Sequence, residues 1–346
     1  MDYGEAVESR RARRVTIKDV AASAGVSIST VSHALNDKGE VNAQTRQRVR
    51  AIASDLGYRP HRAAQAMRGG APRSIALALP RTSGSSEESE LIGLDYYLAI
   101  ASASASEAFA RGNSLVLPPP LGTSDQWAVI NPDGVLICDP SKMDQRIDIL
   151  ESMGIPVVTI EPDTGRLDRP YFVTADTINS TTALLDHLKG VGATKVALLW
   201  ADSTWSWAIE TRRAYETWCD RNDQEAIVAP VPLQALGSEA YRAAGELLDG
   251  SSPPDAIFAS AERYSTGALQ ACHERRLRVP EDVLIVGGVD GSTARLSYPP
   301  VTAVDPRPRE LAEAAVRMLM DRIDGNPVVA PVTVRSEIHL RASSTR

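Results

Sequence analysis

Apolar and polar positions follow a helical period in the first part of the chain. Residues spaced three or four apart form a first stripe, which predicts a helix over 17–24: Ile17, Val20, Ala21 and Ala24. Thr16 and Asp19 have the spacing of a helix-capping pair. Gly25 stands where a left-handed residue would end this helix, and Ser27 is a suitable N-cap for the next one. A tight helix-turn-helix is therefore predicted.

The second predicted helix, over 28–36, has one apolar and one polar face. Val31, Ala34 and Leu35 are expected to point inward. The opposite face, where a recognition helix meets base edges, would carry Ile28, Ser29, Ser32 and His33. Asn42 is expected to cap a third helix, which closes the small core with Val49, Ile52, Ala53 and Leu56.

After residue 74 the pattern changes to short apolar runs that alternate with amphipathic stretches. Strands are expected at 75–79, 114–117, 134–138, 156–160, 195–200, 226–231, 256–259 and 283–286, with helices at 92–111, 142–153, 180–189, 209–221, 239–248 and 266–275. Such alternation is typical of parallel sheets covered by helices on both faces. Two blocks of similar length predict two doubly wound subdomains, followed by a helix at 309–323 and one strand at 332–338.

Charge separates the two parts of the chain. The whole chain has a net charge of -7, whereas Arg10 to Arg73 contains 13 Lys and Arg against 4 Asp and Glu, a net of +9. A basic end on an acidic chain is attracted to phosphate. Arg10, Arg11, Arg13 and Arg14 lie in a polar arm, residues 1–14, which is expected to be disordered.

The remaining composition narrows the class of protein. No apolar run approaches the ~20 residues of a membrane span and no secretory signal is visible, so a cytoplasmic, nucleoid-associated protein without a membrane partner is expected. The three cysteines, Cys138, Cys219 and Cys272, have no metal spacing and are expected to be core thiols. No metal site and no cofactor is expected.

The run VTIKDVAASAGVSISTVSHALNDKGEVNAQTRQRVRAIASDLGYRPHRAAQAMRGG resembles the headpiece and hinge of the lactose-repressor (LacI/GalR) family of bacterial transcription regulators. The resemblance covers more than fifty contiguous residues. It implies a sequence-specific regulator, most often a repressor, that binds a pseudo-palindromic double-stranded DNA operator as a homodimer. It also implies a periplasmic-binding-protein-like rear domain that binds a small-molecule effector, a sugar or sugar-like metabolite.

The resemblance also implies which residues contact DNA. Phosphate contacts are expected from Ser27, Ser29 and Thr30, and base contacts from Ile28, Ser29 and His33. The full set expected at the DNA is Thr16, Ser27, Ile28, Ser29, Thr30, Ser32, His33, Asn36, Arg62, Ala64 and Met67. Residues 61–67 are rich in Ala but too short to form a helix alone in water. They are expected to become helical on DNA, with Met67 wedged into the minor groove; the alternative is a plain linker.

The expected organisation has a basic arm (1–14), a helix-turn-helix headpiece (15–60), a hinge helix with linker (61–73) and an effector-binding and dimerisation domain (74–346). Its first subdomain would comprise about 74–175 and 305–325, and its second about 176–304 and 330–342. Helices such as 92–111 and 142–153 are expected to hold the two subunits of the dimer together. No leucine heptad follows Arg335, so a coiled-coil tetramer is not expected.

Effector residues are sought in the loops that follow the strands, because ligands of doubly wound folds bind at those strand ends. These loops include 81–86, Asp139, 176–179, 201–207, 260–263 and 287–292. The GGVDGS stretch resembles a family motif in which an Asp, here Asp290, accepts hydrogen bonds from an effector hydroxyl. The expected effector contacts are Asp290, Trp205, Asp176, Asn179, Arg212 and Glu262. The alternatives are a structural role for Asp290 as a cap of the following turn, a core position for Trp200, and packing of Trp207 on the helix.

Two other functional classes are alternatives to an effector-controlled DNA-binding regulator. Asp176, Asp202, Glu262 and Asp290 could gather in one cleft as glycosidase carboxylates, but sugar-binding clefts need carboxylates too, and no nucleophile elbow, P-loop or zinc signature is present. The chain is therefore not expected to be an enzyme. The other alternative is a DNA-binding regulator whose rear domain responds to a protein partner instead of a small ligand.

Overall fold

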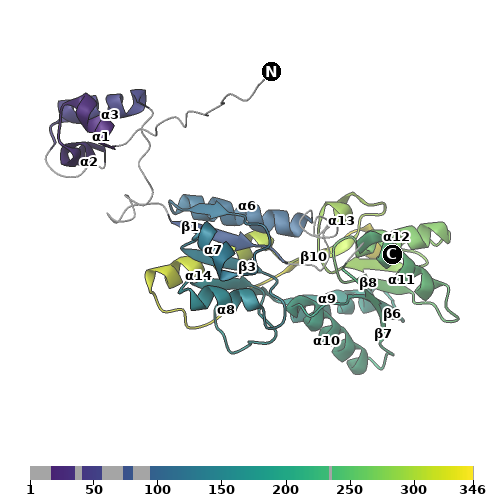
Figure 1. The fold of residues 1–346 in the computed structure, drawn as a ribbon. Helices are drawn as coiled ribbons and strands as arrows, with labels where there is room; N and C mark the ends of the chain where they lie inside the picture. Colours follow the sequence, from purple (N-terminus) through teal and green to yellow (C-terminus); the bar gives the residue numbers. More distant parts are fainter. Residues whose placement is uncertain (1–16, 36–40, 57–72, 81–93, 234–235, 346) are drawn as a thin grey trace, which may run out of the picture. The chain divides into compact units, whose positions relative to one another are not determined.

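The computed structural model describes residues 17–35, 41–56, 73–80, 94–233 and 236–345. The chain divides into two compact units, Met1–Pro72 and Arg73–Arg346. Each unit is described by itself below, and the ribbon of Figure 1 labels its elements.

In its described residues, the first unit contains three helices, α1 (Ile17–Ala24), α2 (Ile28–Leu35) and α3 (Ala43–Asp55). Gly25 adopts φ +64° between α1 and α2, a conformation that few residues other than glycine tolerate. The buried residues of the three helices form one core: Val20, Ala21, Ala24, Val31, Ala34, Val49 and Ala53. Leu56, which was expected in this core, is 37% exposed because it follows the last residue of α3.

The second unit has two six-stranded sheets with the same chain order. The first lobe contains β1 (Ser74–Ala78), β2 (Ser114–Val116), β3 (Gly134–Cys138), β4 (Val157–Ile160), β5 (Phe172–Ala175) and β11 (Val332–Val334), in the order β2-β1-β3-β4-β5-β11. The second lobe contains β6 (Val196–Ala201), β7 (Ile227–Val231), β8 (Ala256–Ala259), β9 (Leu284–Gly287), β10 (Thr302–Asp305) and β12 (Glu337–His339), in the order β7-β6-β8-β9-β10-β12. Pairing is parallel except between β10 and β12.

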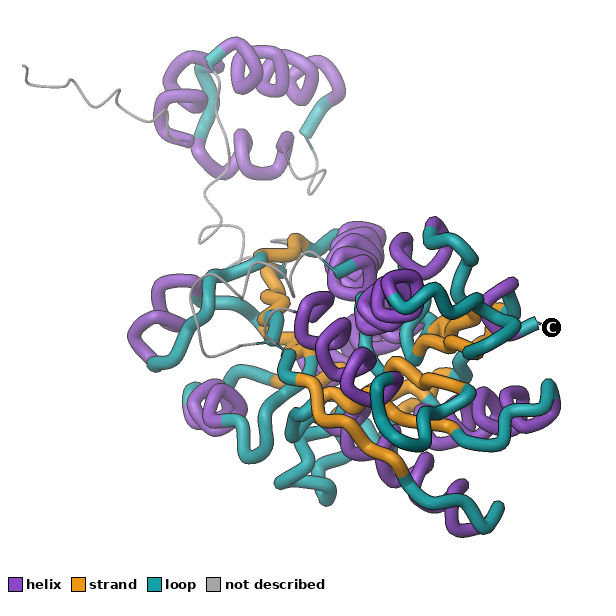
Figure 2. The backbone as a smooth tube through the Cα atoms, turned by 90° about the vertical axis from the view of Figure 1, so that its right-hand side faces the viewer, coloured by secondary structure: helices purple, strands orange, loops and turns teal. Residues whose placement is uncertain are grey.

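Helices cover the sheets of both lobes, as the tube of Figure 2 shows. The first lobe has α6 (Asp95–Ala110), α7 (Ser124–Ile130), α8 (Gln145–Ser152) and α14 (Pro308–Asp324). The second lobe has α9 (Thr177–Gly190), α10 (Ser206–Arg221), α11 (Leu236–Leu248), α12 (Tyr264–Glu274), α13 (Ser292–Leu296) and the 3₁₀ turn η1 (Ala342–Ser344). The predicted fold class, a helix-turn-helix headpiece followed by two doubly wound subdomains, is confirmed.

The C-terminal part of the chain differs from the prediction. The single strand expected at 332–338 is two strands in two sheets: Val332–Val334 pairs with β5, and Glu337–His339 pairs with β10. Between them the backbone N–H of Ser336 donates to the Asp176 carboxylate at 2.7 Å, which holds the chain at the point of crossing. Residues 332–334 therefore extend the first lobe, and were wrongly expected in the second.

The interior is apolar and its thiols are reduced. Cys138, Cys219 and Cys272 are buried and free, as predicted. Among the described residues, none of the helices combines the length and the apolar character that crossing a membrane requires.

Candidate functional site

The start of α2 is capped by the Ser27 side chain. Its hydroxyl oxygen accepts a hydrogen bond from the backbone N–H of Thr30 at 3.1 Å, which satisfies one of the free amides of the first turn. The same hydroxyl lies 2.7 Å from Ser29 Oγ and 2.8 Å from Thr30 Oγ1. Three hydroxyl groups therefore gather beside the positive end of a helix, an arrangement that suits phosphate.

Three of the residues expected to read bases are exposed on α2: Ile28, Ser29 and His33. An isoleucine that is 42% exposed on an eight-residue helix has no role in the core, and it can contact a thymine methyl group. Ser32 was expected on the same face but is 8% exposed. It follows Val31 directly and lies at the edge of the face that packs in the head, so it is not free to meet a base without rearrangement.

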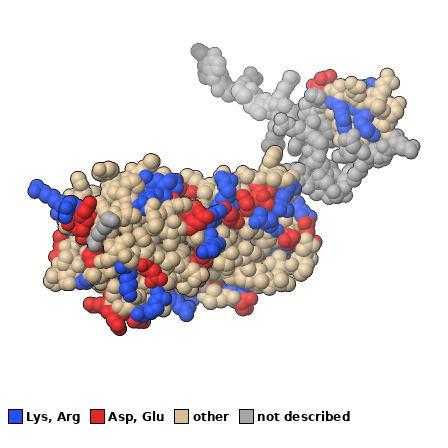
Figure 3. All heavy atoms as spheres, turned by 180° about the vertical axis from the view of Figure 1, so that it is seen from behind, with Lys and Arg blue, Asp and Glu red and all other residues tan. Residues whose placement is uncertain are grey.

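Basic side chains accompany this exposed face. Lys18, Arg48 and Arg50 are exposed on α1 and α3, and Arg46 is half-buried. Figure 3 shows Lys and Arg atoms side by side on one face of the head. Thr16, Asn36, Arg62, Ala64 and Met67, which the sequence placed at the DNA, lie outside the described residues.

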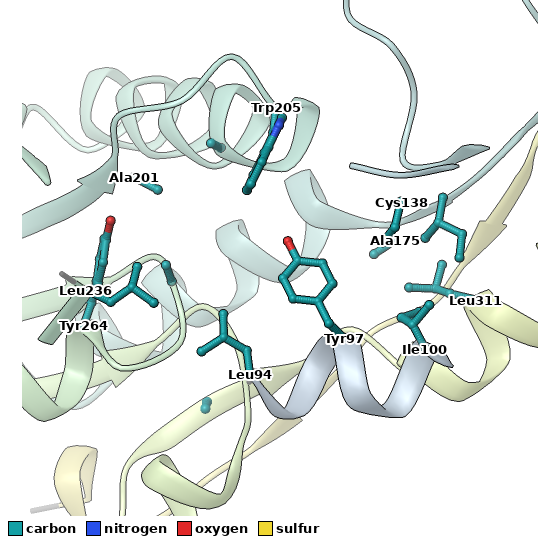
Figure 4. Close-up of a cluster of buried hydrophobic side chains, with 14 of the residues drawn as sticks. Leu94, Tyr97, Ile100, Cys138, Ala175, Ala201, Trp205, Leu236, Tyr264 and Leu311 are labelled. Atoms are coloured by element: carbon teal, nitrogen blue, oxygen red, sulfur yellow. The ribbon is translucent and has the colours of Figure 1, made fainter. Parts of the chain in front are cut away.

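A separate cavity of about 80 Å³ lies in the second unit, where strand ends of the two lobes meet. Its lining includes residues that follow β3, β4, β6 and β8, and it is closed on one side by the start of α6. In Figure 4, Tyr97 from α6 and Trp205 from the start of α10 approach the same space from opposite sides. The lining, which combines aromatic and aliphatic side chains with a few polar groups, is typical of a small-molecule site.

Two buried carboxylates stand at the ends of neighbouring strands in this cavity. Asp139 follows β3 with φ +44°, and Glu161 follows β4 with φ +69°. Left-handed backbone is costly for both residue types, and such strain concentrates at functional sites. The Tyr97 hydroxyl donates to Asp139 Oδ2 at 2.7 Å, whereas Asp139 Oδ1 is buried without a hydrogen-bond partner.

Glu161 is fully engaged by the protein. It accepts hydrogen bonds from the backbone N–H of Ala175 at 3.0 Å and from the hydroxyls of Thr174 at 2.7 Å and Ser206 at 3.0 Å. Ser206 belongs to the second lobe, so this carboxylate links the two lobes. Burial raises the pKa of Glu161, because the charged form loses solvation.

Burial also raises the pKa of Asp139, to about 7, and the neighbouring Glu161 carboxylate adds to the shift. The Tyr97 hydroxyl opposes the shift, since it donates to the charged form. Near neutral pH, Asp139 is thus divided between its charged and neutral forms. A ligand that donates a hydrogen bond or brings a positive charge would favour the charged form.

Glu262 joins the cavity from the loop after β8. Its carboxylate accepts hydrogen bonds from the backbone N–H groups of Asp95 at 3.2 Å and Tyr96 at 3.5 Å, the first turn of α6. Burial raises its pKa as well. Because Glu262 lies in the second lobe and α6 in the first, this is a second polar link across the cavity.

The structure brings only part of the expected effector set together. Trp205 and Glu262 line the cavity, as does Trp207. The Trp205 and Trp207 rings are 6.2 Å apart between centroids. Trp200 instead donates its indole N–H to the carbonyl of Ala208 at 2.9 Å, a structural role.

Asp290 lies outside the cavity lining. Both of its oxygens accept hydrogen bonds from the Arg341 guanidinium at 2.8 Å, and Arg295 lies 3.4 Å away. The structure therefore gives Asp290 a structural partner, the alternative that the sequence had left open. Sequence position alone could not reveal this, because Arg341 is 51 residues further along the chain.

Three other expected contacts also lie elsewhere. Asp176 holds the backbone of Ser336, and Asn179 lies beside it on an open surface depression. The Arg212 guanidinium covers the Trp200 ring at 4.8 Å from its centroid and pairs with Glu216. Asp139 was among the strand-end positions where effector contacts were expected, but it was not in the final set of contacts. Glu161, also directly after a predicted strand, was in neither.

The four carboxylates considered for glycoside hydrolysis do not gather. Of Asp176, Asp202, Glu262 and Asp290, only Glu262 lines the cavity. Within the described residues, no cluster of His, Cys, Asp and Glu side chains is arranged to hold a metal ion.

Two family models match the chain. Residues 16–61 match the bacterial regulatory proteins of the lacI family, and residues 185–344 match a periplasmic binding protein-like domain. The chain is 28% identical to the HTH-type transcriptional regulator CelR of Thermobifida fusca, over 95% of this chain and 98% of the relative. It is 26% identical to the HTH-type transcriptional repressor PurR of Mannheimia succiniciproducens, over 89% and 92% respectively.

Solved structures agree in fold. The lac repressor dimer bound to operator and the anti-inducer ONPF has a TM-score of 0.83 at 23% identity, with 96% of this chain and 100% of that chain covered. A CelR–cellobiose complex has a TM-score of 0.71 at 24% identity, with 95% and 100% covered. Since these relatives are named regulators and repressors, the prediction that the chain is not an enzyme is confirmed.

Proposed function

Because the chain belongs to the LacI/GalR family of DNA-binding transcriptional regulators, we propose that it is a repressor that binds a pseudo-palindromic operator as a homodimer under the control of a small-molecule effector. The observation that carries this proposal is the combination, in one chain, of a capped and exposed recognition helix with a cavity between two lobes.

The head would contact DNA through α2. Ser27, Ser29 and Thr30 present hydroxyls to phosphate, while Ile28 and His33 reach base edges in the major groove. Residues 61–73, of which only Arg73 lies in the described part of the chain, would form the hinge helix and linker, with Arg62 and Ala64 at the minor groove and Met67 wedged between base pairs. Thr16 and Asn36 would flank the recognition helix.

The cavity would hold the effector. Its position at strand ends of both lobes means that a bound molecule touches each lobe, so its affinity depends on how far the lobes are closed. A concave site lined by aromatic rings and carboxylates favours a small ligand over a protein partner. Similar proteins have been solved in complex with cellobiose and with D-xylulofuranose, which supports a sugar-like class for the ligand.

A homodimer would form along α6 and α13. Leu98 and Phe109 on α6, and Leu296 and Tyr298 at α13, are exposed apolar side chains, with Phe109 82% and Tyr298 97% exposed. The two elements are neighbours, since Asp95 at the start of α6 accepts a hydrogen bond from the backbone N–H of Ser292. The second helix expected at the interface, α8, has polar residues at its exposed positions and is left out of this proposal.

The test is selection of binding sites from random duplex by the full-length protein, followed by footprinting. A symmetric site with half-sites about one duplex turn apart is expected. His33→Ala should lower affinity for that site by about 1–3 kcal/mol and relax one base position, whereas Gln47→Ala, exposed on α3, should not relax it. Absence of any preferred symmetric site at physiological salt contradicts the proposal.

A further inference from the structure

The cavity contains several carboxylates and, among its described lining residues, no cationic side chain. Three carboxylates line it, those of Asp139, Glu161 and Glu262, together with several hydroxyls. In the described lining, side-chain nitrogen occurs only in the indoles of Trp205 and Trp207, and Lys, Arg, His, Asn and Gln are absent. A sugar hydroxyl both donates and accepts, whereas an ammonium group donates three hydrogen bonds and accepts none. An ammonium group also brings the positive charge that no side chain of the described lining supplies to these carboxylates.

One acceptor in this lining is without a partner. Asp139 is 2% exposed, and its Oδ1 atom is buried with no hydrogen bond, while Oδ2 accepts from Tyr97. An unsatisfied buried carboxylate oxygen is costly, and native structures usually pair such atoms. Because the Asp139 residue lines the cavity, a bound molecule that approached this side chain would be able to pair the atom with a donor.

The charges of the lining residues also favour a cationic ligand. Glu161 and Glu262 are stabilised by hydrogen bonds from hydroxyls and backbone amides, not by a cation among the described lining residues. A group of buried carboxylates of this kind repels an anionic ligand and favours a cation. The rings of Trp205 and Trp207 add surfaces on which a cation is stabilised by the π-electrons.

We propose that this cavity selects an effector that carries an organic ammonium group, placed against Asp139 Oδ1 and beside the Trp205 ring. The inference rests on the proposed function, since it names the class of the molecule that would occupy the effector cavity. Two classes of compound carry such an ammonium group, amino sugars and aliphatic polyamines, and the experiment includes one of each. Neutral sugars bind less tightly, because they bring no positive charge to offset the negative charge of the carboxylates.

The first experiment uses isothermal titration calorimetry on the full-length protein at pH 6.5. The probes are cellobiose, the β-1,4-linked disaccharide of glucosamine, which differs from it by two amino groups, and spermidine. At least one ammonium probe should bind tenfold or more tightly than cellobiose, and which of the two does so identifies the source. Equal or tighter binding of cellobiose overturns the proposal, as does failure of both ammonium probes to bind below 1 mM.

The second experiment assigns the selectivity to a residue. Asp139→Asn keeps the shape of the side chain and an oxygen for the Tyr97 hydroxyl, and should reduce the preference to twofold or less. Asp148→Asn removes the same charge from α8, where the side chain is 63% exposed and paired with Arg166, and should leave the preference unchanged. Undiminished preference in Asp139→Asn overturns the assignment to this carboxylate.

Proton release gives an independent readout. The titratable groups that face Asp139 are Tyr96 and Tyr97 from α6, Cys138 from β3 and Glu161 from β4. Binding of an ammonium group at pH 6.5 should expel a proton from Asp139, so the measured enthalpy should vary with the ionisation enthalpy of the buffer in the parent protein and not in Asp139→Asn.

Failure of this inference differs from failure of the proposed function. If a neutral ligand alone alters operator binding, the ammonium proposal is wrong and the regulator stands. If no symmetric DNA site is bound, the regulator proposal is wrong whatever the calorimetry shows. The two sets of measurements therefore report on separate claims.

Discussion

Removal of Arg341 should destabilise the second unit, because it leaves Asp290 buried and without its main partner. The Asp290 side chain is 6% exposed and that of Arg341 17%. Two parallel hydrogen bonds of 2.8 Å join them, and Arg341 Nη1 also donates to the carbonyl of Val301 at 2.6 Å. The pair thus joins the C-terminal segment to the loop after β9.

The magnitude follows from burial and from what remains after the substitution. Removing one partner of a buried pair typically costs about 3–5 kcal/mol. Arg295 remains 3.4 Å from the Asp290 carboxylate, and Arg341 is partly solvated, so the cost of Arg341→Met should be nearer to about 2–3 kcal/mol. At an m-value of about 3 kcal/mol per M, the midpoint of urea unfolding would shift by roughly 0.7–1 M.

Urea unfolding followed by tryptophan fluorescence measures this shift. Arg278→Met is the matched control, because Arg278 forms an exposed pair with Asp282 and its removal should cost less than about 1 kcal/mol. Adding Asp290→Asn to Arg341→Met should restore at least half of the loss, since the unpaired charge is then gone. An Arg341→Met midpoint within 0.2 M of the parent, or no recovery in the double variant, refutes the structural role of Asp290.

Three further outcomes are expected. Ser27→Ala should lower the stability of the three-helix unit by about 1 kcal/mol, since the Thr30 amide loses its cap. Hydrogen exchange of α2 in the full chain should accelerate accordingly, and unchanged exchange would be the contrary result. The stability of Asp139→Asn should rise relative to that of the parent protein between pH 5 and pH 8. The reason is that an Asp whose pKa in the folded state is raised to about 7 stabilises the fold at low pH and loses this contribution as the pH rises. Urea midpoints of the two proteins that changed in parallel with pH would argue against this prediction. Gly267→Ala should destabilise the protein by about 1–3 kcal/mol, since its Cβ would lie 2.5 Å from a backbone oxygen of α11. In Gly190→Ala on α9, the added Cβ meets no atom within 4 Å, so this variant should be neutral or stabilising in thermal melts.

Most of the architecture could be predicted because its strands are uninterrupted apolar runs. The strands β1, β3, β4, β6, β8 and β9 lie in the predicted segments, and each is buried along most of its length. The missed or merged strands are short or exposed, as in β11, so their apolar signal is weak. The helix α7 was also missed, although Thr123 and Gln126 form a capping box that the sequence displays.

The head was predicted in more detail than the cavity because its contacts are local. The Gly25 turn and the Ser27 cap involve residues within a few positions of each other, and both are present in the structure. Cavity roles depend on partners far along the chain. Asp290 is paired by Arg341, and Glu262 reaches α6 more than 160 residues away, so no pattern in one segment distinguishes a ligand contact from a structural ion pair.

The polar links across the cavity suggest how occupancy would reach the proposed dimer surface. Glu262 of the second lobe holds the first amides of α6, and the Asp95 carboxylate of α6 accepts from Ser292 at α13. A ligand that draws Glu262 toward itself therefore acts on the helix that carries Leu98 and Phe109. A differential affinity of the ligand for two lobe arrangements, worth about 1–3 kcal/mol, is enough to bias how two copies of α6 meet and hence how far apart two heads are held. On this reasoning Glu262→Gln, which keeps the size of the side chain but weakens its hold on the amides, should reduce the response of operator binding to effector more than operator binding itself.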